Sequence, residues 1–397
     1  MHKVLLTATA LLSMPLQAQE PVEELAGAAP SQQGEEAPGM FTRLSAKMET
    51  LLENLGADGG FDPNEGMDWS VLPGPFYTPE MELGIGVSAV GLYVVDPEDQ
   101  VSQISSLTIN GFASINGALG AQILSQTFWR EDKYRLFIDM EVVDAPEVFY
   151  GSGITAGRNE ANRIDFDRRG YRLHPQFFAR VFPSTYFGIG LEFGQDEADD
   201  LELVQPILSS ASIPFPESST TTAITAHVLF DSRDFILNPS EGRLLQADIA
   251  IYDTALGGDS DFDKLNLDYR DYWQLGPGIL AWQVAAELNR GAVPWDKLAM
   301  LGGSQRLRGY ESGRYRDRQM LLSQVEYRHH LAGRHGLVYW FGVGTLAEEA
   351  RDLGREKWLH SLGFGYRFEV KQRVNLRLDM AFGNGDSGFY FSVNEAF

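Results

Sequence analysis

The chain has 397 residues, a formal net charge of −23 at pH 7 and no cysteine. A balance this acidic argues against a nucleic-acid partner, because the phosphates would repel the chain. The lack of cysteine excludes disulfides and any zinc or iron–sulfur centre that depends on cysteine ligands.

The N-terminus is typical of a secretory signal. His2 and Lys3 precede an apolar run, Val4 to Met14, which is too short to span a bilayer. Ala18 is a small residue of the kind found just before a cleavage site. We therefore predict an exported protein whose signal peptide covers residues 1–18.

The residues after this signal predict a linker. Residues 19–75 begin with a stretch rich in Glu, Pro, Ala and Gly, a composition typical of disorder. Within them, FTRLSAKMETLLENL places its apolar residues on one helical stripe and is followed by Gly56. A periplasmic linker with one amphipathic helix over 41–55 is expected.

From residue 76 to residue 397, apolar and polar residues alternate in recurrent short segments. In VNLRLDMAF, for example, Leu376, Leu378 and Met380 fall on one face and polar residues fall on the other. A soluble β-sandwich also alternates, but its polar face would be richer in Lys, Thr and Ser. Small and charged residues on one face, with aromatic residues on the other, fit the lumen and the lipid side of a barrel. The predicted fold class is all-β, a transmembrane antiparallel β-barrel.

The number of strands follows from the even count that bacterial single-chain barrels require. Fifteen alternating segments can be recognised, and the short turns between them are expected on the periplasmic side. Short turns and long loops should alternate along the chain, and they do so everywhere except between 145 and 168. A strand at EVFYGSGIT would restore the alternation there. Sixteen strands are thus predicted, the other fifteen lying near 81–95, 104–114, 118–129, 134–144, 169–182, 184–194, 222–231, 243–253, 264–274, 278–289, 319–331, 336–346, 357–369, 373–383 and 387–397.

One stretch concentrates positive charge in this acidic chain. LGGSQRLRGYESGRYRDRQ, residues 301–319, holds five arginines and four glycines, most of it within a long loop predicted over 290–318. Such a loop can fold back into the lumen, because glycine tolerates positive φ and arginine grips a carboxylate through two N–H groups. Alternatively, the loop stays exposed and binds the phosphates of lipopolysaccharide.

The centre of that loop resembles a known motif. Leu307, Arg308, Gly309 and Tyr310 are similar to the [V/I]-R-G-[F/Y] motif in the sixth loop of the BamA/TamA superfamily, the bacterial surface antigen barrels. Further segments resemble the same family, so that the likeness covers about four-fifths of the chain: LPGPFYTPEMELGIG, LFDSRDFILNPSEGRLLQADI, SQVEYRHHL and FYFSVNEAF.

The resemblance implies a partner for the loop arginine. In this family the loop folds into the lumen and its arginine contacts an acidic residue, which implies that Arg308 pairs with a carboxylate. Glu326 is the nearest candidate. Gly342 stands where the family usually has an aspartate, so Asp379 or Asp317 is expected to compensate.

The resemblance also implies a location and a function. We expect an outer-membrane protein that inserts, assembles or translocates proteins or lipids, with outer-membrane lipid, including lipopolysaccharide, and client molecules as partners. In this family insertion depends on a weak seam between the first and last strands. Gly84, Gly86 and Gly91, in the expected first strand, would weaken pairing there. The linker is too short for a POTRA domain, so none is expected.

The last expected strand ends the chain with aromatic residues. Phe389, Phe391, Val393 and Phe397 alternate, and they are predicted to share one lipid-facing register. In this class of barrel, a terminal aromatic resembles the signal that the cell's insertion machinery recognises. We therefore predict a C-terminal barrel signal at Phe389, Phe391 and Phe397.

Two other classes of function remain open. A passive pore or a structural surface antigen fits the barrel, and an outer-membrane barrel enzyme is less favoured. GDSG, residues 385–388, falls in the turn before the last strand, where a hairpin explains it without catalysis. GGDSDFD, residues 257–263, lacks the distal glutamate of a calcium loop. We expect no enzyme, no metal site and no cofactor.

Overall fold

The computed structural model describes residues 50, 54–56, 60–61, 66–78, 81–203 and 218–397. All of them belong to one compact unit, Lys47–Phe397. The predicted signal peptide lies outside the described residues, as do most of the linker, in which a POTRA domain was not expected, and most of the helix predicted over 41–55.

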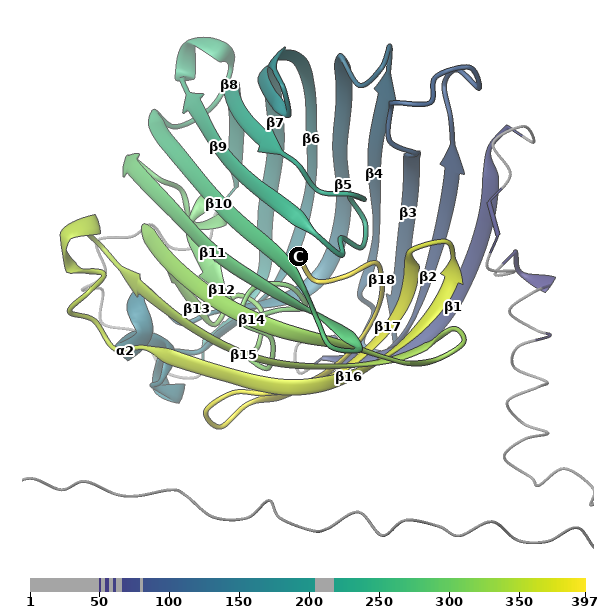
Figure 1. Ribbon diagram of the computed structural model, residues 1–397. Coiled ribbons are helices and arrows are strands. Elements are labelled where there is room, and N and C mark those ends of the chain that lie inside the picture. Colours follow the sequence, from purple (N-terminus) through teal and green to yellow (C-terminus); the bar gives the residue numbers. More distant parts are fainter. Residues whose placement is uncertain (1–49, 51–53, 57–59, 62–65, 79–80, 204–217) are drawn as a thin grey trace, which may run out of the picture. The chain divides into compact units, whose positions relative to one another are not determined.

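Sixteen antiparallel strands close into a single barrel (Figure 1). Each strand pairs with its neighbours along the chain, and β1 meets β18 to complete the ring. Two further short strands, β12 and β13, pair with each other within the loop between β11 and β14. The strands are β1 (Asp68–Thr78), β2 (Glu82–Tyr93), β3 (Ser105–Ser114), β4 (Leu119–Trp129), β5 (Tyr134–Phe149), β6 (Ile164–Phe182), β7 (Thr185–Leu203), β8 (Ser219–Asp231), β9 (Gly242–Tyr252), β10 (Phe262–Leu275), β11 (Gly278–Gly291), β12 (Ala299–Leu301), β13 (Tyr315–Asp317), β14 (Gln319–Ala332), β15 (His335–Ala347), β16 (Leu359–Lys371), β17 (Val374–Phe382) and β18 (Ser387–Val393).

In the described connections between strands, the helical elements are short. They are α2 (Gly153–Gly157), η1 (Glu160–Asn162), η2 (Thr254–Leu256), η3 (Trp295–Lys297) and η4 (Ala350–Asp352). Among the described residues, none of the helices has the length and apolar character needed to cross a membrane.

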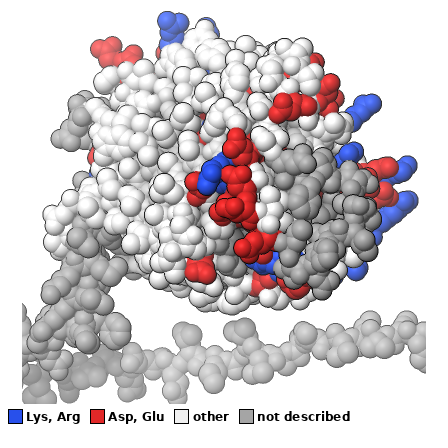
Figure 2. All heavy atoms as spheres, turned by 180° about the vertical axis from the view of Figure 1, so that it is seen from behind, with Lys and Arg blue, Asp and Glu red and all other residues white. Residues whose placement is uncertain are grey.

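The two faces of each strand differ as the alternation predicts. On β2, Leu83, Ile85 and Val87 are exposed on the outside, whereas Gly84, Gly86 and Ser88 point inward. The outer surface therefore carries apolar side chains without a soluble protein's polar cover, and large parts of it hold no charge (Figure 2). A closed ring pairs its strands all round, which lets such a surface lie in lipid.

The count of sixteen is confirmed, but one predicted strand was wrong. EVFYGSGIT is not a separate strand, because β5 continues to Phe149 and α2 begins at Gly153. The strand missing from the prediction is β1, so the barrel begins at Asp68 rather than at residue 76. β1 contains Pro73 and Pro75. Proline is uncommon in strands, so this segment was not predicted as one.

The barrel has two unlike ends. At one end, which we call the turn end, four connections are only two residues long: 183–184, 276–277, 333–334 and 372–373. At the other, the loop end, lie α2, η2 and the long connection 292–318. In outer-membrane barrels the short turns face the periplasm and the long loops face outward.

Candidate functional site

The loop 292–318 folds back into the barrel. β12 and β13 bring its two arms together, with Ala299 opposite Asp317. Leu301, Leu307 and Tyr310 are buried against inward-facing apolar side chains of the barrel wall. Those wall residues are Ala285, Met320, Leu322, Leu346 and Leu359, on β11, β14, β15 and β16. The loop is therefore held partly by the burial of apolar surface.

Arg308 lies at the centre of this docked loop and is 0 % exposed. Its Nη1 lies 2.5 Å from Asp379 Oδ2, and its Nη2 contacts Glu326 Oε1. The guanidinium also stacks on Trp340, 3.7 Å from the ring centroid. The structure thus brings Arg308 to both Glu326 and Asp379, whereas Asp317 lies elsewhere, in β13.

The other residues of the motif fix the backbone beside Arg308. Gly309 has φ +100°, and a Cβ there would lie 2.8 Å from backbone atoms of Phe382. Its N–H donates to the Tyr390 hydroxyl at 3.1 Å. The Tyr310 hydroxyl donates to the carbonyl of His360 at 2.6 Å. Only glycine allows the loop to approach β17 this closely.

Gly342 has a clear packing role. A Cβ at this position would lie 3.1 Å from Leu307 Cδ1, so Leu307 lies directly against the glycine. A larger side chain here, such as aspartate, would require Leu307 to shift. The second carboxylate therefore comes from Asp379 on β17, which is where the departure from the family pattern is compensated.

The carboxylates that hold Arg308 belong to a larger ring of charges. Arg367 lies 2.6 Å from Asp379 and 2.8 Å from Glu395. Arg328 lies 3.3 Å from Glu326 and 3.9 Å from Glu395. Positive and negative groups alternate around the ring, and every side chain is at most 6 % exposed: Arg308, Asp379, Arg367, Glu395, Arg328 and Glu326. Such pairing offsets the large desolvation penalty of buried charges.

The ring includes the tail that follows β18. Asn394 has φ +69°, which turns the chain inward after Val393. Phe397 is buried with Tyr272 and Ala281, and its carbonyl accepts a 2.6 Å hydrogen bond from Arg328. The C-terminus consequently lies inside the barrel (Figure 1).

This tail corrects the predicted register. Phe389 is partly exposed, as expected for an outward-facing residue, but the Phe391 ring lies against Gly74 and Gly86, on the inward face of β1 and β2. Phe397 does not share the lipid-facing register of Phe389, because the strand ends at Val393. The alternation of the sequence continues beyond the strand, and nothing in it marks the turn at Asn394.

The remaining arginines of the loop are largely engaged as well. Arg306 pairs with Glu287 at 2.7 Å, and Arg316 pairs with Glu147 at 2.5 Å. Arg314 contacts Glu160 and Asp386, at 2.5 and 3.2 Å. With Arg308, four of the five arginines in 301–319 meet carboxylates of the barrel or its loops. These four do not form the exposed cationic patch that lipopolysaccharide phosphates would need.

The family model for the Omp85 superfamily domain matches residues 128–397, which is more than half of the chain. The chain belongs to the Omp85 superfamily. Its resemblance to BamA/TamA barrels is thereby confirmed, and it is a β-barrel of the bacterial outer membrane. None of the curated proteins matches the sequence significantly.

Solved structures give the same fold at low sequence identity. BamA from Haemophilus ducreyi lacking POTRA domains 1–3 is 13 % identical with a TM-score of 0.51, over 92 % of this chain and 80 % of that one. CdiB from Acinetobacter baumannii is 13 % identical with a TM-score of 0.51, over 82 % of this chain and 59 % of that one. CdiB from Escherichia coli is 10 % identical with a TM-score of 0.51, over 82 % of this chain and 61 % of that one.

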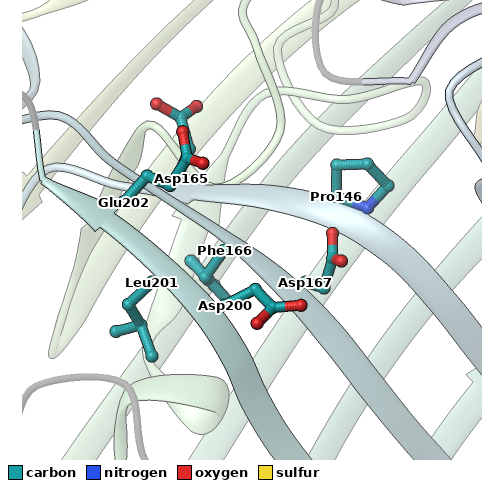
Figure 3. Close-up of a pocket in the computed structure, with 7 residues that line it drawn as sticks. All are labelled: Pro146, Asp165, Phe166, Asp167, Asp200, Leu201 and Glu202. Atoms are coloured by element: carbon teal, nitrogen blue, oxygen red, sulfur yellow. The ribbon is translucent and has the colours of Figure 1, made fainter.

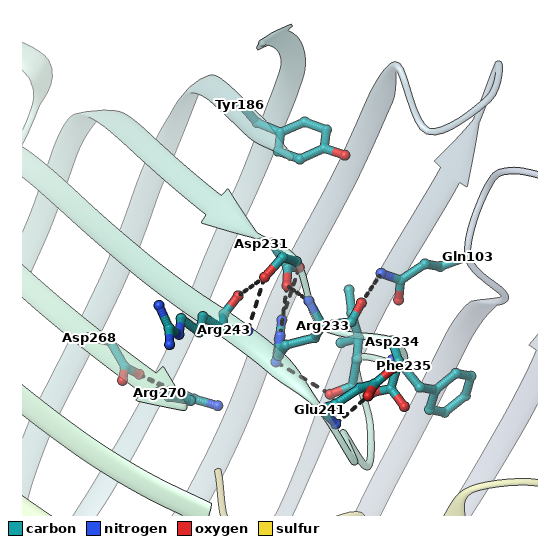
Figure 4. Close-up of polar contacts among 12 residues, drawn as sticks. Gln103, Tyr186, Asp231, Arg233, Asp234, Phe235, Glu241, Arg243, Asp268 and Arg270 are labelled. Carbon is teal, nitrogen blue, oxygen red and sulfur yellow. Dashed lines mark hydrogen bonds and ion pairs between the residues drawn. The ribbon is translucent and has the colours of Figure 1, made fainter. Parts of the chain in front are cut away.

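The turn end of this Omp85 barrel is covered by the connection between β8 and β9 (Figure 4). Asp231, at its start, binds Arg233 and Arg135, each at 2.8 Å. Gln103 Nε2 then donates to the Arg233 carbonyl at 3.3 Å, and Asp234 pairs with Arg373 at 2.6 Å. These partners lie in the β2–β3 and β16–β17 connections, so the turn reaches across the mouth of the barrel.

Two polar cavities remain in the lumen. One, of about 690 Å³, lies beside the docked loop, and the other, of about 440 Å³, reaches toward the turn end. The tip of the loop, Ser304 and Gln305, lines both. They also share wall residues, chiefly Gln122, Asp139 and Gln246. The loop, the β8–β9 turn and the tail thus line polar cavities inside the Omp85 barrel.

A further pocket lies outside this arrangement, at the ends of β5, β6 and β7 (Figure 3). Its volume is about 550 Å³, and its lining is acidic: Pro146, Asp165, Phe166, Asp167, Asp200, Leu201 and Glu202. In the described part of the chain, no group of carboxylates and histidines has the geometry of a metal site. The docked loop and its ring of charges are therefore the stronger candidate site.

The ionisation of Asp317 predicts that docking of the loop depends on pH. Burial raises the pKa of Asp317 to about 6, and the hydrogen bond from the Arg318 backbone N–H offsets only part of this rise. The unfolded pKa is about 3.9. Because the folded pKa is the higher one, stability is fully present below about pH 4 and falls as pH rises through about 6. We expect loop docking to weaken by roughly 1–3 kcal/mol between pH 4 and pH 7.

The measurement is protease digestion of the loop in the refolded barrel at both pH values. Asp317→Asn should reduce the difference, because the amide does not titrate, while Asp296 in the same loop, whose pKa burial raises to about 6, should keep part of it. Equal pH dependence in the variant and the parent would show that other groups govern the docking.

Proposed function

We propose that this Omp85 barrel inserts or translocates proteins at the outer membrane by opening between β1 and β18, without catalysing a reaction. The observation that carries the proposal is the weakness of this seam. β1 and β18 share a single register pair, Tyr77 opposite Phe389. On their other sides, β1 pairs with β2 over eleven residues and β18 pairs with β17 over seven. Fewer ladder hydrogen bonds make this joint the easiest to separate.

Opening at a seam solves a physical problem of insertion. A strand that enters lipid alone leaves its backbone groups unpaired, at several kcal/mol for each group. A parted seam offers an edge on which such a strand can pair before it reaches lipid. The proposed outer partner of the barrel is outer-membrane lipid, including lipopolysaccharide.

The ring of charges supports the proposal because it holds the remaining wall together. Arg308 ties the loop to β14 and β17, and Glu395 ties the tail to β14 and β16. All of these strands lie on the β18 side of the seam. We propose that they stay assembled while β1 moves away.

Reconstitution tests the function. The purified barrel is placed in phosphatidylcholine liposomes, and an eight-stranded outer-membrane barrel unfolded in urea is added as client. Folding of the client is followed on gels, since a closed barrel migrates faster unboiled than boiled. We expect faster folding than in empty liposomes or in liposomes that carry a porin. No acceleration, together with ion leakage from the vesicles, would instead favour a passive pore.

The glycines expected in the first strand lie outside the two strands that form this seam. Gly84, Gly86 and Gly91 lie in β2, not in the first strand. They therefore take no part in the ladder between β1 and β18, although a Cβ at Gly86 would lie 3.5 Å from the Phe391 ring of β18.

A further inference from the structure

A threonine hydroxyl in the lumen is hydrogen-bonded to a histidine that is itself held by a carboxylate. Thr225 Oγ1 lies 2.8 Å from His227 Nε2, and His227 Nδ1 lies 2.7 Å from Asp248 Oδ1. Thr225 and His227 belong to β8, and Asp248 is directly opposite His227 on β9. These two strands stand across the barrel from the seam. The three residues come from separate segments, so no local motif in the sequence reveals them.

The direction of each hydrogen bond follows from the groups involved. An ionised carboxylate only accepts, so His227 donates from Nδ1 to Asp248 and keeps a free electron pair on Nε2. Thr225 therefore donates its hydroxyl proton to that nitrogen. Gln246 Nε2 donates to both oxygens of Asp248, at 3.0 and 2.9 Å, which fixes the carboxylate. The three groups thus stand in the order of nucleophile, base and orienting acid.

A second histidine donates to the same hydroxyl. His174, on β6, places Nε2 3.3 Å from Thr225 Oγ1. Gln176 Nε2, which can only donate, lies 3.3 Å from His174 Nδ1, so His174 carries its proton on Nε2. Gly190, on the intervening strand β7, makes this approach possible, since a Cβ there would lie 2.6 Å from Thr225 Oγ1. The hydroxyl therefore has one basic nitrogen and one N–H donor beside it.

These groups line a space that can hold a small substrate. Thr225, His174, His227 and Asp248 all line the lumen cavity of about 690 Å³ beside the docked loop. Polar side chains make up most of its lining, which suits a short acyl group better than a long one. Thr225 is only 1 % exposed, so a small carbonyl group is the one that can approach its hydroxyl.

We propose that Thr225, His227 and Asp248 hydrolyse short-chain carboxylic esters inside the lumen. This activity goes beyond the proposed insertion of proteins, which involves no reaction. Thr225 Oγ1 attacks the carbonyl carbon of the ester and its proton passes to His227 Nε2, while Asp248 stabilises the charged ring. The carbonyl oxygen takes the negative charge, and the N–H of His174 is the nearby donor that can stabilise it.

The rest of the reaction uses the same proton acceptor. The bond from the acyl carbon to the alcohol oxygen breaks, and the alcohol leaves with the proton from His227. Water then attacks the acyl group on Thr225 and gives a proton to His227 Nε2. The acyl–oxygen bond to Thr225 breaks, and the hydroxyl takes that proton back. One ester and one water thus become one acid and one alcohol.

A covalent probe tests the nucleophile. The refolded full-length barrel is treated with a fluorophosphonate, and the modified residue is identified by mass spectrometry. We expect an adduct on residue 225, with release of fluoride, in the parent and in Thr225→Ser. Thr225→Val should lose the adduct, because valine keeps the shape but has no hydroxyl. Thr221→Val is the matched control, since Thr221 is also buried on β8, and it should be labelled like the parent.

Ester turnover tests the base and the substrate class. Hydrolysis of 4-nitrophenyl acetate should fall by about 100-fold in His227→Gln and in Asp248→Asn, within the usual contribution of a general base. 4-Nitrophenyl palmitate should stay intact. The fast-migrating band on an unboiled gel shows that each variant is a closed barrel. Client folding is measured on the same preparations, so that failure of the ester reaction is distinguished from failure of insertion.

Arg308→Ala adds a measurement in which the docked loop cannot shield the hydroxyl. Because this change should release the loop, the variant should be labelled faster at Thr225 than the parent is. Absence of an adduct on Thr225 in both barrels would overturn the proposal. So would turnover of 4-nitrophenyl acetate that Thr225→Val leaves unchanged. Equal hydrolysis of the palmitate ester would overturn the assignment to short-chain substrates.

Discussion

Arg308→Ala should release the loop from the lumen. The change leaves Glu326 and Asp379 buried without their shared arginine, although Arg328 and Arg367 still neutralise part of their charge. We therefore expect a loss of about 3 kcal/mol, near the lower end of the range for breaking a buried ion pair. The first measurement is the urea concentration at which half of the protein loses the fast-migrating folded band on an unboiled gel. The second is cleavage of the loop by external protease.

Two variants test whether the loop is held by the contact of Arg308 with Glu326 and Asp379 or only by its positive charge. Arg308→Lys should restore only part of the loss, because lysine cannot contact both carboxylates through a planar fork. Arg306→Ala is the matched control, since Arg306 pairs with Glu287 in the same loop but its side chain is 45 % exposed. We expect it to change stability by less than about 1 kcal/mol. If Arg308→Ala behaved like Arg306→Ala, the contact of Arg308 with Glu326 and Asp379 would not be what holds the loop.

Gly309→Ala should undock the loop without removing a charge. The added Cβ would lie 2.8 Å from backbone atoms of Phe382, and the residue would keep φ near +100°. Overlap with a strand backbone and an unfavourable φ together should cost about 2–5 kcal/mol. The loop should become protease-sensitive, as in Arg308→Ala.

Gly354→Ala is the control for this glycine. Nothing lies within 4 Å of a Cβ added at Gly354, so the change should be nearly neutral. Combining Gly309→Ala with Arg308→Ala should add little further loss, because each alone releases the same loop. Full additivity of the two losses would indicate that the residues support different structures.

Sequence reasoning identified the barrel because the alternation of apolar and polar residues directly reflects the two faces of each strand. It also identified Arg308, Glu326 and Asp379, through the resemblance of the loop motif. It missed Trp340 and Arg367, which complete the surroundings of the guanidinium. Their roles depend on where neighbouring strands place them, and no local pattern distinguishes them from other inward-facing residues.

The two ends of the barrel sequence misled the prediction for different reasons. β1 was missed because Pro73 and Pro75 argue against a strand, yet at a seam a missing N–H disrupts no ladder. Phe397 was placed in lipid because the alternation of β18 continues past its end. The positive φ of Asn394 redirects the tail, and the ionic contacts of Glu395 hold it in the lumen.

A disulfide across the seam tests the central claim, that the barrel acts by parting β1 from β18. Tyr77→Cys with Phe389→Cys joins the register pair of the seam, and opposed residues of an antiparallel pair lie within disulfide range. The control is Phe364→Cys with Met380→Cys, a register pair within the wall formed by β16 and β17.

The measurement is the rate of client folding in liposomes, with each disulfide first oxidised and then reduced. The account predicts that the oxidised seam abolishes the acceleration, that reduction restores it, and that the control barrel is equally active in both states. Undiminished acceleration by the barrel with its seam locked would contradict the account.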